Sequence, residues 1–298
     1  MKAVFLMNMG GARDEDELKL FLFNMFRDKR IISSPIRYLL APIIAKLRYK
    51  KVWQNYELIG GSPIYKITDS LIYKVSKHFD DIQLFSVMRY TTPRASEIIK
   101  ENKIKEALLF PLYPHFSTTT TLSSFDDVKG IKTIKIERFY KEKKFNEAII
   151  EKIIDSLGDW NSSEVNLIFS AHGLPQKIID KGDSYEKEIN EHIDILSEML
   201  PTFKSINLAY QSKVGPMKWL EPSLDEKLKE FKNQKVLVYP ISFTIDNSET
   251  DLELGIEYAE QAKELNIDYR VSPVLNDSDK FVTFIVDKIK KELKKSKK

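Results

Sequence analysis

Asn166-Leu-Ile-Phe-Ser-Ala-His172-Gly-Leu-Pro175 is the stretch that decides the fold. An apolar run rich in strand-forming residues ends here in a histidine, and Gly173 and Pro175 then break the pattern. The pattern predicts a buried strand whose C-terminal end opens into a loop. Ligands of open α/β sheets bind at that end of the strands. His172 is therefore a candidate functional residue, and a hydrogen-bonded scaffold histidine is the alternative.

Strands and helices alternate on both sides of this stretch. Apolar runs predict strands at 3–9, 82–88, 106–111, 131–136, 165–170, 205–209, 236–240 and 268–271. Helical patterns separate most of them, and the last predicts a closing helix at 277–294. This alternation indicates an α/β fold of two parallel-sheet lobes with a cleft between them. We place the lobes at 1–140 and 141–298, with a closing helix that can pack across both.

The composition excludes several classes of function. The 47 basic and 44 acidic residues give a net charge of +3, too even to indicate nucleic acid as the main partner. The absence of cysteine excludes disulfides, cysteine nucleophiles, thiolate metal sites and an iron–sulfur cluster. The apolar N-terminal run is too short for a signal-peptide core, and no run approaches the ~20 residues of a membrane span. We therefore expect a cytoplasmic protein.

Residues 31–51 place an apolar stripe beside a cationic one. The stripes are formed by Ile36, Leu39, Leu40, Ile43, Ile44 and Leu47, and by Arg37, Lys46, Arg48, Lys50 and Lys51. Such a segment suits a helix packed on the core. It equally suits a lip that holds a large flat apolar ligand, or a peripheral membrane contact.

Ionisable side chains follow two predicted strands of the second half. His172 follows one strand, and Asp246, Glu249 and Glu253 follow another. Glu249 and Glu253 are four residues apart, so they face the same way on a helix. A neutral imidazole opposite a carboxylate can hold a divalent cation loosely or take protons from a substrate. Ordinary surface carboxylates are the alternative interpretation for both glutamates.

Several familiar catalytic motifs do not occur in the chain. HExxH, GxSxG, GxGxxG and GxxxxGK[ST] are all missing, which removes the main support for zinc hydrolases, nucleophile-elbow hydrolases and nucleotide-binding folds. A hydroxyl-rich run at 117–124 follows the predicted strand at 106–111. It suits either an anion cradle or a simple helix cap.

Segments along nearly the whole chain resemble the ferrochelatase family, and their order is the same. The matching segments are Asn8-Met9-Gly10-Gly11, 21–28, 40–46, Ile59-Gly60-Gly61-Ser62-Pro63, Arg89-Tyr90, Tyr113-Pro114, Phe169–Pro175, Gly182-Asp183, Tyr210–Pro216, Trp219-Leu220, Asp246 and Glu249-Thr250. Several long motifs in one order are far more specific than a single short pattern.

The resemblance implies a fold and a site. The fold would be two Rossmann-like lobes with a porphyrin cleft. His172 and Glu249 match the family's metal-site and proton-handling pair, and Glu253 and Asp246 match the acidic residues beside them. Positions that match porphyrin contacts are Met9, Arg48, Tyr56, Ser62, Arg89, Tyr113, Ser117, Thr119 and Trp219.

The resemblance also implies an activity, that of a lyase that inserts Fe²⁺, as substrate, into protoporphyrin IX. No permanently bound cofactor is expected. Asn247 departs from the pattern because many relatives carry a histidine there. A porphyrin or haem carrier without turnover, and a related cobalt or coproporphyrin chelatase, are the alternative functions. A monomer is compatible with the sequence, which does not fix the oligomeric state.

Overall fold

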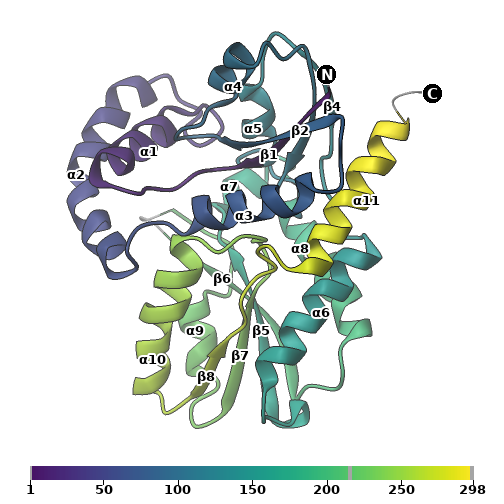
Figure 1. The fold of residues 1–298 in the computed structure, drawn as a ribbon. Coiled ribbons are helices and arrows are strands. Elements are labelled where there is room, and N and C mark those ends of the chain that lie inside the picture. The colour runs from purple at the N-terminus through teal and green to yellow at the C-terminus, as the bar shows by residue number, and fades with distance from the viewer. Residues whose placement is uncertain (1, 214–216, 296–298) are drawn as a thin grey trace. The chain divides into compact units, whose positions relative to one another are not determined.

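The computed structural model describes residues 2–213 and 217–295, which group into two compact units. The first unit contains residues 2–138 and 277–295, and the second contains 139–213 and 217–276. The sequence predicts a boundary at 140/141 and places the closing helix in the second lobe, from where it can pack across both. That helix, α11 (Asp279–Lys295), instead groups with the first unit, where it packs against α3 (Ile64–Ser76) (Figure 1). The ends of the Tyr210–Pro216 motif and of the basic tail lie outside the described residues.

The first unit is built on a parallel sheet of four strands in the order β2-β1-β3-β4. The strands are β1 (Lys2–Asn8), β2 (Ile82–Met88), β3 (Glu106–Pro111) and β4 (Lys132–Lys135). The other helices of this unit are α1 (Glu15–Arg27), α2 (Arg37–Leu58), α4 (Ala95–Glu101) and α5 (Thr121–Asp127). Val4, Phe5 and Leu6 of β1 are fully buried, as expected for a central strand covered on both faces.

The second unit contains a second parallel sheet, in the order β6-β5-β7-β8. Its strands are β5 (Val165–His172), β6 (Ser205–Gln211), β7 (Lys235–Pro240) and β8 (Asp268–Val271). Its helices are α6 (Lys143–Leu157), the short 3₁₀ turn η1 (Ser162–Glu164), α7 (Gln176–Ile179), α8 (Tyr185–Met199), α9 (Leu224–Lys229), the π-helix η2 (Glu249–Glu257) and α10 (Tyr258–Glu264).

Both sheets have the same strand order, although the sequence shows no internal repeat. In each unit the first strand is central, the second strand pairs on one side and the third on the other. The order in which strands are added across the sheet therefore reverses between β1 and β3 in the first unit, and between β5 and β7 in the second. Ligands of such sheets bind at the carboxyl ends of the strands beside this switch point. His172 ends β5, so it lies at the switch point of the second unit.

Helix α2 differs from its predicted position. The sequence predicts an amphipathic segment at 31–51, whereas the helix begins at Arg37 and continues to Leu58. Its inward side is formed by the small residues Ala41 and Ala45, which lets it pack closely against α1. Large apolar side chains point outward, and Leu39 and Leu47 are 71% and 76% exposed. The helix thus packs on the core with one side and exposes large apolar side chains on the other.

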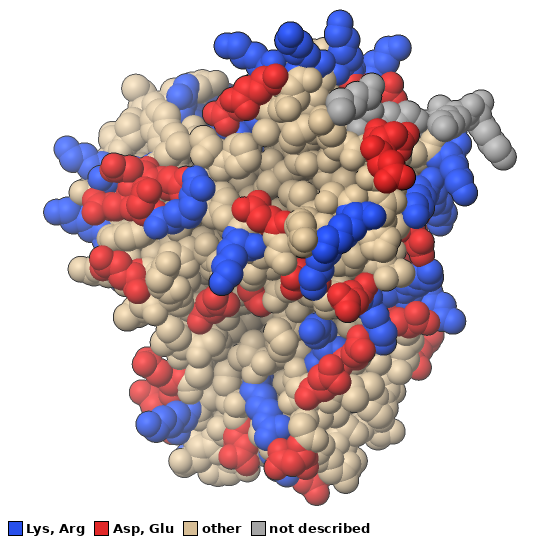
Figure 2. All heavy atoms as spheres, viewed as in Figure 1, with Lys and Arg blue, Asp and Glu red and all other residues tan. Residues whose placement is uncertain are grey.

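Charged side chains of both signs lie interspersed on the face drawn in Figure 2. Within 2–213 and 217–295, no helix has the length and apolar character needed to cross a bilayer.

Candidate active site at the carboxyl edge of the second sheet

The centre of the site is a hydrogen bond between His172 and Glu249. His172 is the last residue of β5, and Glu249 is the first residue of η2, which follows the loop after β7. The His172 Nδ1 atom lies 2.8 Å from Glu249 Oε2. The two side chains are 35% and 25% exposed, so the pair is accessible from outside the protein. The strand ends on which the sequence placed these groups do bring them together.

Hydrogen bonds to Glu249 converge on one of its two oxygens. Oε2 is 2.8 Å from His172 Nδ1, and it accepts from Ser212 Oγ at 2.8 Å and from Gln211 Nε2 at 3.3 Å. The described residues provide no hydrogen bond to Oε1. The carboxylate is thus held firmly by one oxygen, while the other is free to bind a cation.

The same geometry fixes the tautomer of the imidazole. A carboxylate accepts hydrogen bonds, so Nδ1 of His172 carries its proton toward Glu249. A neutral His172 then presents an unprotonated Nε2, for which the described residues offer no partner. The imidazole is therefore arranged to accept a proton at Nε2.

Electrostatics favour an ion pair in the free protein. Burial lowers the pKa of His172, but the charge and hydrogen bond of Glu249 outweigh it and raise the pKa above its ordinary value. For Glu249, burial raises the pKa, and the opposing effects of His172, Ser212 and Gln211 bring it below its usual range. An imidazolium and a carboxylate are the consistent charge states.

Ser212 links Glu249 to a second carboxylate. Its Oγ lies 2.8 Å from Glu249 Oε2 and 2.6 Å from Glu253 Oε2. Burial and the nearby charge of Glu249 raise the pKa of Glu253 to about 8. A protonated Glu253 can donate to Ser212, which then donates its single hydrogen to Glu249. The expectation that Glu249 and Glu253 face the same way is confirmed, on a π-helix instead of an α-helix.

A Glu253→Gln variant should show how far this carboxyl resists ionisation. The folded-state pKa of Glu253, about 8, exceeds the ordinary 4.5 of the unfolded chain. Between these values the folded protein holds a proton that the unfolded chain has released, so Glu253 makes stability fall as pH rises. Glutamine removes that dependence. We expect the free energy of unfolding in urea of the variant, relative to that of wild type, to be at least ~1 kcal/mol higher at pH 8 than at pH 5. The same exchange at exposed Glu264 should give no such difference, and parallel curves for Glu253→Gln would contradict the expectation.

Asn247 lies two residues before the first residue of the π-helix. Its Oδ1 accepts a hydrogen bond from Glu249 N at 2.9 Å, and its own N–H donates to Thr250 Oγ1 at 2.9 Å. These bonds satisfy backbone groups that a helix start leaves without partners. The side chain of Asn247 thus fixes the backbone of Glu249 at the start of the helix.

Asp246 is held by a residue that the sequence did not single out. Asn276 Nδ2 donates to Asp246 Oδ2 at 2.5 Å, and Asn276 Oδ1 accepts from Asp246 N at 2.8 Å. Both residues belong to the second unit. The side chain of Asn276 therefore binds the carboxylate and the backbone of Asp246 together.

Trp219 lies beside the loop that follows His172. It forms an isolated bridge with Pro175, and the indole N–H is buried without an acceptor among the described residues. A Cβ atom on Gly173 would lie 2.8 Å from Gln211 O and 3.5 Å from Trp219 Cε3. Glycine at this position thus allows the ends of β5 and β6 to approach closely, which brings Gln211 and Ser212 to the site.

Four of the residues implied as porphyrin contacts lie in the first unit and differ from one another in how exposed they are. Met9 is half-buried, and its carbonyl accepts from Tyr90 N at 3.0 Å. Ser62 donates its N–H to Ala12 O at 2.8 Å, while no described residue bonds to its buried hydroxyl. Arg48 is exposed on α2, whereas Tyr56 of the same helix is buried and stacks on Trp53.

Arg89 is committed to acidic partners inside the first unit. Its guanidinium lies 2.8 Å from Asp28 and 3.2 Å from Asp127, and its Nε donates to Ser123 Oγ at 2.8 Å. Arg94 also pairs with Asp127, at 2.6 Å, so two cations balance two carboxylates. Such a buried, paired network costs several kcal/mol to break. Arg89 thus connects the end of α1 to β2 and α5.

The hydroxyl-rich run is buried at the start of α5. Ser117 and Thr119 are 1% and 4% exposed, and their hydroxyls lie 2.8 Å apart. Tyr113 is also buried, with its hydroxyl 3.4 Å from Ser124 Oγ. The N-cap residue of α5, Thr120, makes no side-chain cap hydrogen bond, and Ser117 Oγ instead accepts from Thr119 N at 3.1 Å within the preceding loop.

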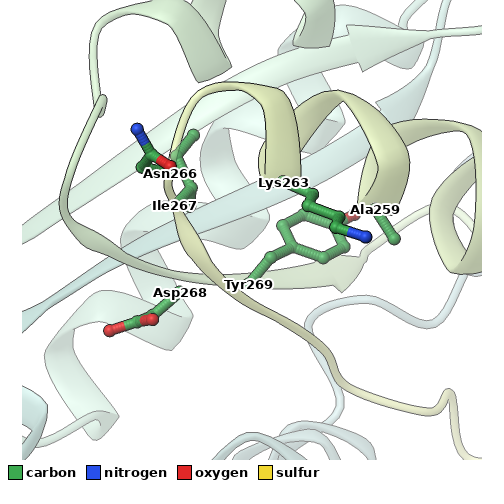
Figure 3. Close-up of a pocket in the computed structure, with 6 residues that line it drawn as sticks. All are labelled: Ala259, Lys263, Asn266, Ile267, Asp268 and Tyr269. Carbon is green, nitrogen blue, oxygen red and sulfur yellow. The ribbon is translucent and has the colours of Figure 1, made fainter.

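A shallow pocket at the opposite end of the second sheet contains none of these groups. Figure 3 shows its lining, in which Lys263 of α10 lies beside Tyr269 of β8. Asp268 begins β8, so the pocket lies at the amino end of that strand. The carboxyl ends of the strands carry the candidate site.

The fold defines a two-unit α/β protein with parallel sheets. Among solved structures, SirB from Bacillus subtilis with Fe3+ resembles it with a TM-score of 0.58 and 9% identity, covering 98% of this chain and 95% of that chain. At this identity the likeness concerns the fold alone.

Sequence comparison identifies the family. The sequence model of the family Ferrochelatase matches residues 1–293. A ferrochelatase of Nitratiruptor sp. is 48% identical, over 96% of this chain and 98% of its own, and a ferrochelatase of Wolinella succinogenes is 49% identical, over 96% of each chain. The chain belongs to the ferrochelatase family.

Proposed function

We propose that this chain inserts Fe²⁺ into protoporphyrin IX and forms protohaem, the last step of haem biosynthesis. Membership of the ferrochelatase family supports this proposal. The single structural observation that carries it is the His172–Glu249 pair, which keeps Nε2 and Oε1 free at an accessible sheet edge. A base and a cation ligand side by side are what the exchange of two pyrrole protons for one metal ion requires.

His172 would act as the base of this reaction. Each new bond from iron to a pyrrolic nitrogen displaces the proton of that nitrogen, so two protons leave as one dication enters. The unprotonated Nε2 accepts a proton while the Nδ1–H bond to Glu249 keeps the ring oriented. An approaching dication lowers the pKa of the imidazolium, because like charges repel. The resting ion pair would thus be converted to the neutral base as iron arrives.

Glu249 would receive the iron through Oε1 and release it to the ring. Its Oε2 stays bound by His172, Ser212 and Gln211, so the carboxylate need not reorient. Glu253 holds a proton in the resting site, so it would first release that proton toward solvent and then take up one through Ser212, and we propose that Asp246 provides a further acceptor on the way. Iron is a substrate in this scheme and passes through the site.

We propose that the porphyrin contacts come from the set that the family resemblance implies. Arg48 is exposed and can pair with a propionate carboxylate, while Met9 and Ser62 are half-buried. The other members of the set in the first unit would act by supporting these contacts, since Tyr56, Ser117 and Thr119 are buried in the core.

Anaerobic turnover with Fe²⁺ and protoporphyrin IX tests the proposal directly. Haem formation, followed by its absorbance, is the expected result. Tight porphyrin binding without insertion would identify a carrier instead. Parallel reactions with Co²⁺ and with coproporphyrin would distinguish the related chelatases by their higher turnover.

We also propose that α2 brings a cytoplasmic monomer reversibly onto anionic membranes. Exposed Leu39 and Leu47 offer apolar anchors, and the cationic residues of the same helix complement anionic lipid. Flotation with anionic vesicles should recover the protein, and added salt should weaken this recovery. Burial of each leucine contributes roughly 1.5–3 kcal/mol, so Leu39→Ser/Leu47→Ser should weaken binding at least tenfold.

A matched control for the vesicle experiment is Ile154→Ser, an exposed apolar residue on α6. It should float like wild type. Equal recovery of all three proteins, or equal recovery on neutral vesicles, would exclude the proposed contact. Sedimentation of the unbound protein would test the monomer.

A further inference from the structure

The backbone of His172 lacks a strand partner on one side. Pairing between β5 and β7 ends at Ser170 and Pro240, while pairing with β6 continues to His172. The carbonyl of Ser170 accepts from Ile241 N at 3.0 Å, and two residues later the backbone points to the same side. The N–H and C=O of His172 therefore face a position where β7 has already ended.

Two hydroxyl groups take the place of the missing strand. His172 N donates to Ser242 Oγ at 3.0 Å, and Tyr185 Oη donates to His172 O at 3.0 Å. The two hydroxyl oxygens lie 2.6 Å apart. Each hydroxyl has one hydrogen, and that of Tyr185 is used on the carbonyl, so Ser242 donates to Tyr185. The three bonds form a closed ring through the peptide groups of His172, which we call the hydroxyl ring.

The ring is buried, so water does not readily replace it. Ser242 and Tyr185 are 9% and 7% exposed. Tyr185 is placed by the start of α8, where its N–H donates to Asp183 Oδ1 at 3.0 Å, and Gly182 makes the preceding turn with a φ of +93°. The Gly182-Asp183 segment of the sequence thus serves to aim the Tyr185 hydroxyl at His172.

We propose that Tyr185 and Ser242 are positioning residues that hold His172 in register with Glu249. The inference rests on the proposed function, because it gives the hydroxyl ring its role in iron insertion. Both backbone groups of His172 are tied to the ring, and the imidazole must reach Glu249 Oε2 at 2.8 Å from that backbone. If the end of β5 were held less firmly, the imidazole would move away from Glu249. Reaction rates depend strongly on the position of a catalytic group, so the rate would fall.

Tyr185→Phe and Ser242→Ala each remove one hydroxyl and open the ring. Loss of supporting contacts of this kind typically lowers activity by ~10- to 100-fold, so we expect kcat to fall about tenfold. KM for the porphyrin should stay within about twofold, because neither hydroxyl is placed as a porphyrin contact. The double variant should lose no more than the worse single variant, since one break already opens the ring.

A second readout does not depend on turnover. The chain has four histidines, so ¹⁵N-histidine labelling gives four imidazole signal sets, and His172→Ala identifies that of His172. Tyr185→Phe should shift the His172 signals. The matched control is Tyr140→Phe, which removes a hydroxyl bonded to Glu191 from a ring 5.8 Å from His192. It should shift the His192 signals, leave those of His172 in place and retain wild-type kcat.

Thermal unfolding identifies any variant that fails to fold, in which case the other single variant carries the test. Unchanged His172 signals in a folded Tyr185→Phe or Ser242→Ala protein would overturn the inference, as would an unchanged kcat. If wild type inserts no iron while the His172 signals still shift, the proposed function fails but the hydroxyl ring as a support of His172 stands.

Discussion

His172→Ala should bind protoporphyrin IX but form haem at least ~10²–10⁴-fold more slowly than wild type. The variant removes the imidazole whose Nε2 is placed to accept a proton, and it leaves Glu249 without its charged partner. Anaerobic turnover with Fe²⁺, followed by haem absorbance, measures the rate. Fluorescence quenching on titration with the porphyrin measures binding separately.

The matched control for this variant is His78→Ala, since His78 is exposed at the end of α3. Its turnover should equal that of wild type. The stability of His172→Ala should fall, because the variant leaves the partly buried carboxylate of Glu249 without its charged partner, and thermal unfolding would show whether the variant is still folded at the assay temperature. Wild-type turnover by His172→Ala would remove the residue from the mechanism, whereas equal loss of porphyrin binding and turnover would indicate a binding role.

Glu249→Gln should lower turnover ~10²-fold or more, with porphyrin affinity within about twofold of wild type. Glutamine keeps the size of the side chain but removes the charge that orients the imidazole and that we propose receives iron. Because Glu249 raises the pKa of His172, its removal should lower that pKa. The acidic limb of the pH profile of the residual kcat/KM should therefore move to lower pH.

Glu264→Gln, on the exposed side of α10, makes the same exchange outside the site and should leave both rate and pH profile unchanged. The opposite pattern for Glu249→Gln, weaker porphyrin binding at normal turnover, would argue against its proposed role. An acidic limb that stays in place would show that His172 does not titrate against Glu249.

Most of the fold was predictable because burial patterns in parallel sheets are local. The strands at Ile82–Met88, Glu106–Pro111 and Asp268–Val271 match their predicted bounds. Central strands of such sheets are continuous apolar runs, and their lengths can be read from the chain. The π-helix was not predictable, since Glu249 and Glu253 share a side in either kind of helix. Its start is held by the hydrogen bonds of Asn247 to Glu249 N and Thr250 Oγ1, and the sequence alone does not show that these bonds form.

The pairing of His172 with Glu249 could be predicted, but the groups that orient it could not. Both residues follow strands on either side of the switch point, which places them at one sheet edge. Gln211 and Ser212 lie in a segment whose resemblance to the family was clear, yet nothing in their spacing says which oxygen they bind. The sequence also does not distinguish a polar side chain that bonds to other protein groups from one that binds a ligand. Ser117 and Thr119 are an example, because their hydroxyls bond to each other.

The backbone of Ser212 is in a strained conformation that a glycine would adopt without strain. Its φ is +67°, in the left-handed region where residues with a Cβ are disfavoured by on the order of 1 kcal/mol. Glycine would relieve that strain, but it has no hydroxyl to lie between Glu249 and Glu253. Chemistry and folding therefore favour different residues at position 212. The protein is less stable at position 212 because the serine hydroxyl is needed between two carboxylates. A search for stabilising substitutions would therefore choose glycine at position 212 and remove that hydroxyl from the site.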